Sequence, residues 1–260
     1  MRAAEKLIAD HGVENVSIRE IVAAADQKNE SALQYHFKNF SGLLGAIRAE
    51  RSDQVRLKRA EMLEAILART PEPSLRQLCA LMIMPAFELA RENLDFRHYI
   101  KAFGNELALS ETSPLRAVAK KGGGGEGGEQ LGQLLKKALP HLDKTDYRRR
   151  MEAAVLLCSA SMYHQARQKS AFRGPQSDLF LHSLIDALFG LLGAPVSVVA
   201  AGLFMAGRAV GAGLDLKGCS PVLPPSRGRV GFGVDAAGVC GVVARFPLSG
   251  RRPPPASLGR

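Results

Sequence analysis

The chain has 260 residues, of which 46% are hydrophobic, and it carries a formal charge of +10. This length can form one large or two small domains and can bury a sizeable core. The four cysteines are Cys79, Cys158, Cys219 and Cys240, and they lie far apart without a CxxC or Cys/His cluster. This spacing argues against a metal site or a disulfide framework, and it fits a reducing cytoplasm.

The positive charge suits a polyanionic partner, but its distribution weakens that argument. From Gly190 onward, eight Lys/Arg and two Asp supply a charge of +6, so residues 1–189 carry only +4. Net charge alone therefore does not indicate DNA binding, and only the local placement of the basic residues can indicate it.

The first predicted element is an amphipathic helix near residues 3–11, with Ala4, Leu7 and Ile8 facing inward and Gly12 as its stop. Because this segment is charged and amphipathic rather than continuously apolar, no signal peptide is expected.

A second helix is predicted to begin at Ile18, because Ser17 and Glu20 form a capping box. Its apolar residues recur at helical spacing; they are Ile18, Ile21, Val22 and Ala25. The pattern breaks at residues 26–28, and another short helix follows.

In that next helix Leu33 and Phe37 form an apolar i, i+4 pair, and a different face carries only hydrogen-bonding groups and one cation. The residues of the polar face are Ser31, Gln34, Tyr35 and Lys38. Two short helices joined by a tight turn, the second with such a face, are typical of a helix-turn-helix with its recognition helix.

The run Gln34-Tyr35-His36-Phe37-Lys38, followed by Leu43-Leu44, resembles the end of the recognition helix in TetR-family transcriptional regulators. The resemblance covers about residues 3–60. The sequence of residues 31–37 is similar to that of one subgroup of the family, in which the turn is one residue longer than usual. Asp26 stands where the family usually has Gly with positive φ, a conformation that Asp tolerates better than most residues. The chain starts inside the family's first helix, so a preceding basic arm is expected to be missing.

This resemblance implies a set of DNA-binding residues, namely Ser17, Arg19, Lys28, Asn29, Ser31, Ala32, Gln34, Tyr35, His36 and Lys38. We expect Tyr35 and Lys38 to contact phosphates and Ser31 and Gln34 to reach base edges. Seven basic residues lie between positions 28 and 59 against three acids, and Arg48 is a weaker phosphate candidate than Lys38. A solvated helical face is the alternative explanation of the later basic residues.

A long helix is predicted to begin after Asn39 and to run past Arg59, followed by a loop at residues 70–74. Further helices are predicted at residues 75–91, kinked by Pro85, and at 94–109, 131–139, 143–169 and 176–192. The glycine run at 122–128 is interpreted as a flexible linker, since no GK[ST] sequence follows it. Strand-like alternation is hardly visible before residue 190, so the predicted class is all-α.

Three regions are expected: a helix-turn-helix head of three helices at residues 1–48, a helical effector-binding and dimerisation domain at 49–193, and an irregular tail at 194–260. The family resemblance implies the effector site, and it implies that the last two helices pair with their copies in a second subunit as a four-helix bundle. Candidate effector contacts are Met82, Phe87, Phe103 and Met162, because Met and Phe suit adaptable apolar cavities. Ordinary core packing is the competing interpretation of each.

From Gly190 to the end there are fourteen Gly and eight Pro but no Glu, which indicates a disordered tail. Such a composition also fits an aberrant extension read in a shifted frame of GC-rich DNA. A rival interpretation rests on residues 187–207, which carry no charge over a length that could span a bilayer, although Pro195 and several glycines interrupt them.

Together these features predict a cytoplasmic homodimeric repressor that responds to an unidentified small-molecule effector and binds a palindromic operator in double-stranded DNA. No enzyme activity, cofactor, catalytic residue or metal site is expected, because no nucleophile–base pairing or paired carboxylates emerge from the spacing. The alternatives are a membrane-anchored DNA-binding protein and a helical small-molecule-binding protein without a DNA role.

Overall fold

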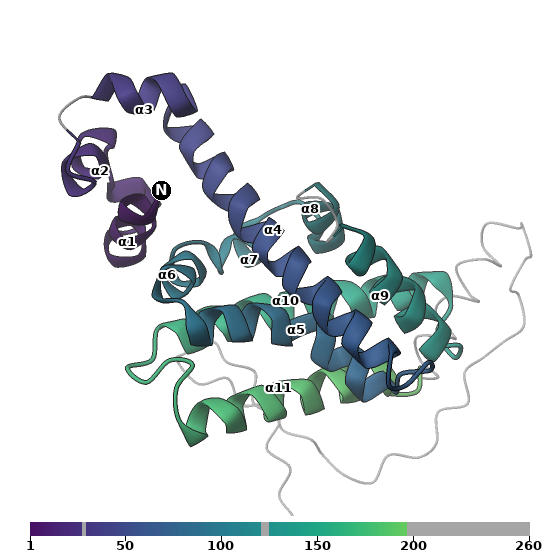
Figure 1. Ribbon diagram of the computed structural model, residues 1–260. Coiled ribbons are helices and arrows are strands. Elements are labelled where there is room, and N and C mark those ends of the chain that lie inside the picture. Colours follow the sequence, from purple (N-terminus) through teal and green to yellow (C-terminus); the bar gives the residue numbers. More distant parts are fainter. Residues whose placement is uncertain (28–29, 121–124, 197–260) are drawn as a thin grey trace, which may run out of the picture. The chain divides into compact units, whose positions relative to one another are not determined.

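The computed structural model describes residues 1–27, 30–120 and 125–196 (Figure 1). The regular secondary structure in these residues is helical. Within these ranges no strand occurs, which confirms the predicted all-α class. All described residues fall in a single compact unit.

Three short helices and a 3-10 turn form the head, and they are α1 (Arg2–His11), η1 (Val13–Asn15), α2 (Ile18–Ala24) and α3 (Glu30–Phe37). Gly12, with φ 86°, ends α1 as predicted, because a left-handed backbone there turns the chain out of the helix. Ser17 caps α2 with the predicted capping box. The local start and stop signals of the sequence therefore position the head's helices.

The long helix α4 (Phe40–Leu67) belongs to two hydrophobic cores in succession. Leu43 and Ile47, near its beginning, are buried in the head's core. Leu63, near its end, is buried in the core of the helical domain. A displacement of α4 in one core would therefore also displace the α4 side chains that are buried in the other core.

The helical domain comprises α5 (Leu75–Glu92), α6 (Leu94–Phe103), α7 (Glu106–Leu109), α8 (Pro114–Lys120), α9 (Gly125–Ala138), α10 (Lys144–Ala166) and α11 (Pro175–Gly193). The central helix is α5, which packs against α4, α6, α9 and α11 (Figure 1). Phe87 on α5 is fully buried and meets the ring of Phe172 edge-on, with 5.6 Å between ring centroids. Pro85 lies inside α5, as the sequence predicted.

The single helix predicted at residues 94–109 is wrong, because the chain breaks between α6 and α7 at Gly104 and Asn105. The carbonyl of Gly104 accepts a hydrogen bond from Ser159 Oγ of α10 at 2.6 Å. A Cβ atom at Gly104 would lie 2.5 Å from the Ile100 carbonyl oxygen and 3.0 Å from Tyr163 Cβ of α10, so glycine suits this position. The end of α6 therefore coincides with a close contact to a helix that is distant in the sequence.

The interpretation of residues 122–128 as a linker is wrong for its second half, since α9 begins at Gly125 and includes Gly127 and Gly128. A Cβ atom at Gly127 would lie 3.2 Å from Ala60 Cα, so the glycine permits the close approach of α9 to α4. The helix α8 was not predicted, although Pro114 suits the first position of a helix. Residues 121–124 lie outside the described part of the chain.

The predicted tail begins at residue 194, and its positions 197–260 lie outside the described residues. Arg150 of α10 donates hydrogen bonds to the carbonyls of Leu191, Leu192 and Pro195, which satisfies the end of α11. In the ranges that the structure describes, no helix is long and apolar enough to cross a membrane. The apolar stretch at 187–207 lies partly outside those ranges.

Candidate DNA-binding surface

After α2 the chain turns at Asp26, whose φ of 54° places it in the left-handed region. The sequence anticipated this conformation, which Asp tolerates better than most residues. The amide of Asp26 donates to the carbonyl of Ala23 at 3.1 Å, and that of Gln27 donates to Val22 at 3.0 Å. These bonds end α2 and set the direction in which the chain leaves it.

Three of the predicted reading residues lie in α3 and the fourth directly follows it, and all four are exposed; they are Ser31, Gln34, Tyr35 and Lys38. Tyr35 is 84% exposed, an unusual position for a large aromatic side chain unless it meets a partner. On the opposite face Leu33 is buried in the head's core and Phe37 packs against that core. One side of α3 is thus anchored while the other stands in solvent.

A close approach of α3 and α4 fixes the angle between the two helices at Lys38, Asn39 and Gly42. Lys38 has φ 65° and donates its amide to the carbonyl of Gln34 at 2.9 Å. Asn39 then caps α4, because its Oδ1 accepts a hydrogen bond from Gly42 N at 2.8 Å. A Cβ atom at Gly42 would lie 1.9 Å from the Phe37 carbonyl oxygen, so only glycine fits there. Gly42 is a positioning residue that the sequence reading missed.

The other predicted DNA-binding residues differ in how the structure places them. The Ser17 hydroxyl is used within the head, since it donates to Glu20 Oε2 at 2.7 Å and accepts from Glu20 N at 3.2 Å. Arg19 and His36 are exposed, and the His36 ring lies between those of its two neighbours, 5.2 Å from Tyr35 and 6.2 Å from Phe37. Ala32 lies in α3, and Lys28 and Asn29 lie outside the described residues.

Most basic residues of α4 have intramolecular partners, and the exposed pairs of Arg56 and Lys58 agree with the alternative explanation of a solvated helical face. Arg48 Nε donates to both carboxylate oxygens of Glu106, at 3.1 and 3.2 Å, and its guanidinium stacks 5.0 Å from the Phe103 ring centre. Arg51 is buried against Glu5. Arg56 and Lys58 pair with acids one turn away on α4 itself. Four of these cations are therefore occupied by intramolecular partners.

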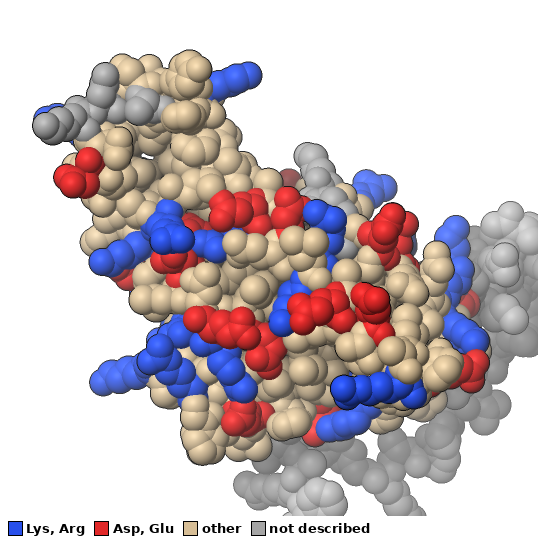
Figure 2. Space-filling model, in the orientation of Figure 1, with Lys and Arg blue, Asp and Glu red and all other residues tan. Residues whose placement is uncertain are grey.

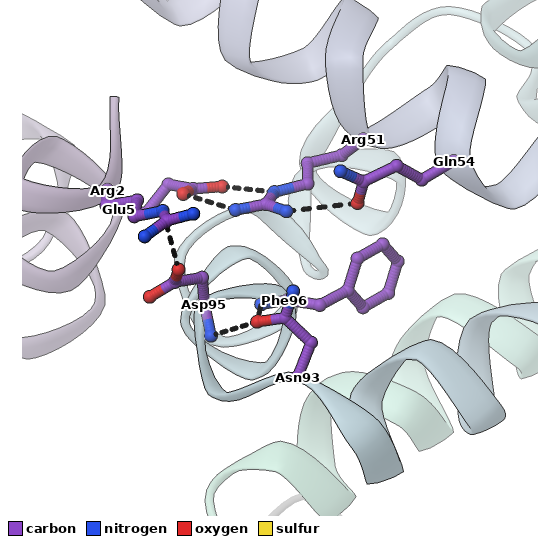
Figure 3. Close-up of polar contacts among 7 residues, drawn as sticks. All are labelled: Arg2, Glu5, Arg51, Gln54, Asn93, Asp95 and Phe96. Atoms are coloured by element: carbon purple, nitrogen blue, oxygen red, sulfur yellow. Dashed lines mark hydrogen bonds and ion pairs between the residues drawn. The ribbon is translucent and has the colours of Figure 1, made fainter.

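A buried ion pair joins α1 to α4 (Figure 3). Arg51 donates from Nε and Nη2 to the two carboxylate oxygens of Glu5, both at 2.7 Å, and from Nη1 to Gln54 Oε1 at 3.0 Å. Glu5 is 1% exposed and Arg51 is 5% exposed. The hydrogen bonds to Glu5 raise the pKa of Arg51 above its usual value. Such a bidentate pair fixes the orientation of α1 on α4.

Helix α6 also contacts α1, through two further ion pairs, which are exposed, and through a shared core. Arg2 Nε lies 3.0 Å from Asp95 Oδ2 (Figure 3), and Lys101 Nζ lies 2.9 Å from Asp10 Oδ1. The hydrogen bond from Lys101 lowers the pKa of Asp10 below its usual value. Phe103 of α6 is buried in the head's core, so the head is packed directly onto the helical domain.

Few charged side chains lie on the head in the face shown in Figure 2. Acidic and basic side chains are interspersed over the helical domain, whereas the head shows one acidic patch on its side and basic and uncharged atoms at the end that carries α3. Few carboxylates therefore oppose the approach of a polyanion to that end on this face.

The helical domain contains two adjoining cavities, of about 320 and 220 Å³. Of the four candidate effector contacts, Met82 lines both cavities and Phe103 and Met162 line the smaller one. Phe87 instead lies in the core with Phe172 and Phe180, as the competing interpretation of these residues held. Arg59, Tyr99 and Cys158 also line the cavities, and no pattern in the sequence predicted this.

Among the described residues no group of three or more His, Cys, Asp and Glu is placed to hold a metal ion. Cys79 and Cys158 are free thiols, and burial raises their pKa values to about 11 and about 12. Both are therefore protonated near neutral pH. Cys219 and Cys240 lie outside the described residues.

Two successive short helices, the first ending at a left-handed Asp26 and the second with an exposed polar face, are typical of the helix-turn-helix class of DNA-binding proteins. Residues 1–47 match the family model described as bacterial regulatory proteins, tetR family. The match agrees with the fold in placing a TetR-type helix-turn-helix at the N-terminus, and it supports a DNA-binding transcriptional regulator. No curated protein matches the chain.

Proposed function

We propose that this protein is a ligand-responsive transcriptional repressor that acts as a homodimer on a palindromic operator. The exposed polar face of α3 carries the proposal, because it stands on a rigid scaffold inside the segment that matches the tetR model. The head corresponds to residues 1–48 and the effector-binding and dimerisation domain to residues 49–193. We also assign the chain to the subgroup with a one-residue-longer turn before the recognition helix.

Dimerisation is supported by the outer face of α11. Leu179 and Phe189 are 60% and 44% exposed there, and Ala187, Gly190 and Gly193 are exposed small residues that would let a second helix approach. Large apolar side chains exposed on one helix are commonly covered in helical dimers, and small residues beside them allow the two helices to approach closely. A two-fold dimer would present one α3 to each of two successive major grooves, about 34 Å apart.

The ligand response is supported by the path from the cavities to the head. Tyr99 and Phe103 of α6 line the smaller cavity, and Phe103 is also part of the head's core. An effector that displaces α6 or α4 would rotate the head and change the separation of the two recognition helices. Affinity for the operator would then fall because the two half-sites could no longer be bound together.

Selection of bound sequences from random duplex DNA tests this function directly. We expect an inverted repeat whose half-site centres are about 10 base pairs, or a multiple of that, apart. Enrichment of a single unrepeated site would contradict the palindromic operator. The absence of any enriched sequence would contradict the DNA role and leave the helical small-molecule-binding protein as the remaining interpretation.

Two substitutions on α3 should have different effects on the selected site. Gln34→Ala is expected to relax the preference at one position of each half-site, at a cost of about 1–3 kcal/mol there, because a base-edge contact is lost. Lys38→Gly is expected to weaken all sequences alike and to reduce the salt slope by about 0.9 for each phosphate contact removed. Glycine is used because Lys38 has φ 65°, which alanine would adopt only with strain.

Fluorescence anisotropy titrations at several salt concentrations measure both effects. Lys136→Ala is the matched control, because Lys136 is an exposed lysine on α9 in the helical domain. If Lys38→Gly changed the sequence preference while Gln34→Ala did not, the assigned roles would be reversed. If neither changed binding, α3 would not be the reading helix.

A further inference from the structure

The larger cavity is almost entirely apolar but contains one cation. It lies among α4, α5, α8, α9 and α10, and its volume of about 320 Å³ is near the lower end of small-ligand pockets, which span about 300–1,000 Å³. Met82, Leu131, Leu135 and Val155 contribute to its apolar wall. Among the described residues that line either cavity, Arg59 is the only charged one.

Arg59 lacks the partner that every neighbouring cation of α4 has. Its Nε atom is buried and makes no hydrogen bond, and no carboxylate of the described residues forms an ion pair with its guanidinium. Burial lowers the pKa of Arg59, but a guanidinium remains charged at any physiological pH. Arg59 as a whole is half-buried, but its Nε is shielded from water and makes no hydrogen bond, so a counter-charge supplied by an anion from outside would stabilise it.

The other polar groups at the cavity cannot take a second negative charge. The Tyr147 hydroxyl already donates to the carbonyl of Gly132, at 3.2 Å. Cys158 is a neutral thiol and only a weak hydrogen-bond donor. A doubly charged phosphate would therefore keep one charge unpaired in an apolar environment, whereas a carboxylate would be neutralised by Arg59 alone.

The smaller cavity gives the apolar part of such a ligand a place to lie. Its walls share Met82, Val155 and Cys158 with the larger cavity, so the two adjoin. It leads away from Arg59 to Tyr99 and Phe103 of α6, where its wall is apolar and aromatic. A narrow chain that extends from Arg59 into this space would press on the helix that holds the head.

We propose that the effector is an aliphatic monocarboxylate whose head group pairs with Arg59 and whose chain lies along the two cavities toward α6. This inference rests on the proposed ligand response and names the chemical class of the ligand. Arg59 is the residue that selects the charge, and the thioether and aliphatic side chains around it accept the chain without strict shape requirements. Because Arg59 lies on α4, the head group and the chain act on the two helices that position the head.

The test compares three probes of equal chain length, decanoate, decanol and decylamine, by isothermal titration calorimetry with the full chain. We expect decanoate to bind at least about tenfold more tightly than decanol, and decylamine not to bind. Arg59→Met should remove the preference for decanoate over decanol while leaving decanol binding within a factor of about two. Arg56→Met is the matched control, since Arg56 lies one turn earlier on α4 and pairs with Asp53.

Equal binding of decanoate and decanol to the wild type would overturn the proposal without any variant, and so would an unchanged preference in Arg59→Met. Absence of binding by all three probes would overturn it as well. Decanoate should also release the operator selected from random DNA. Decanoate binding without any DNA binding would refute the proposed regulator but keep the ligand class, whereas DNA binding without decanoate binding would refute only the ligand class.

Discussion

Replacing Glu5 by glutamine is expected to lower the free energy of unfolding by about 3–5 kcal/mol, because Arg51 would remain buried without a counter-charge. The side chains of Glu5 and Arg51 are 1% and 6% exposed, so water cannot replace the lost carboxylate. The head should loosen first, since this pair joins α1 to α4. Urea unfolding followed by circular dichroism measures the change, and operator binding should fall in parallel.

Asp10→Asn is the matched control for this prediction, because Asp10 also lies on α1 and also pairs with a cation of another helix. Its ion pair with Lys101 is exposed, so we expect a loss of no more than about 1 kcal/mol. The double variant Glu5→Leu/Arg51→Met should recover most of the stability, since two apolar side chains replace the buried pair. Equal, small losses in Glu5→Gln and Asp10→Asn would show that the buried pair contributes nothing special.

Replacing Phe189 by glutamate is expected to convert the protein to a monomer and to weaken operator binding by about 100-fold or more. The proposed dimer covers the exposed face of α11, and a buried unpaired carboxylate there would oppose association. Once the subunits separate, each head binds only one half-site and the gain from linked binding is lost. Light scattering at micromolar protein concentration and anisotropy titrations with the selected operator measure the two effects.

Leu57→Glu is the control for the dimer prediction, because Leu57 is 63% exposed on α4 and receives the same replacement. It should remain dimeric and bind DNA as the wild type does. A point variant is more informative than a truncation before α10, because Met151, Ala154 and Leu184 belong to the core of the helical domain. If Phe189→Glu stayed dimeric, the interface would lie elsewhere than on this face of α11.

The sequence by itself determined the head in considerable detail, because the signals there are local. The capping box of Ser17 and Glu20 and the stop at Gly12 each involve residues within one helical turn, whereas the positive φ of Asp26 was expected from the family resemblance. The spacing of Leu33 and Phe37 likewise separated the buried side of α3 from its exposed side. Local backbone preferences and a short apolar period suffice for such features.

Tertiary structure decided which charged residues are available to bind a partner and where the helices of the helical domain end. Arg48, Arg51 and Arg59 look alike in the sequence, yet one pairs with Glu106, one is buried against Glu5, and one faces a cavity without a partner. Gly104 follows the end of α6 and Gly127 lies within α9, and each stands where another helix comes close, α10 through Tyr163 and α4 through Ala60. These outcomes depend on contacts between residues far apart in the chain, so they cannot be predicted from the pattern of neighbouring residues.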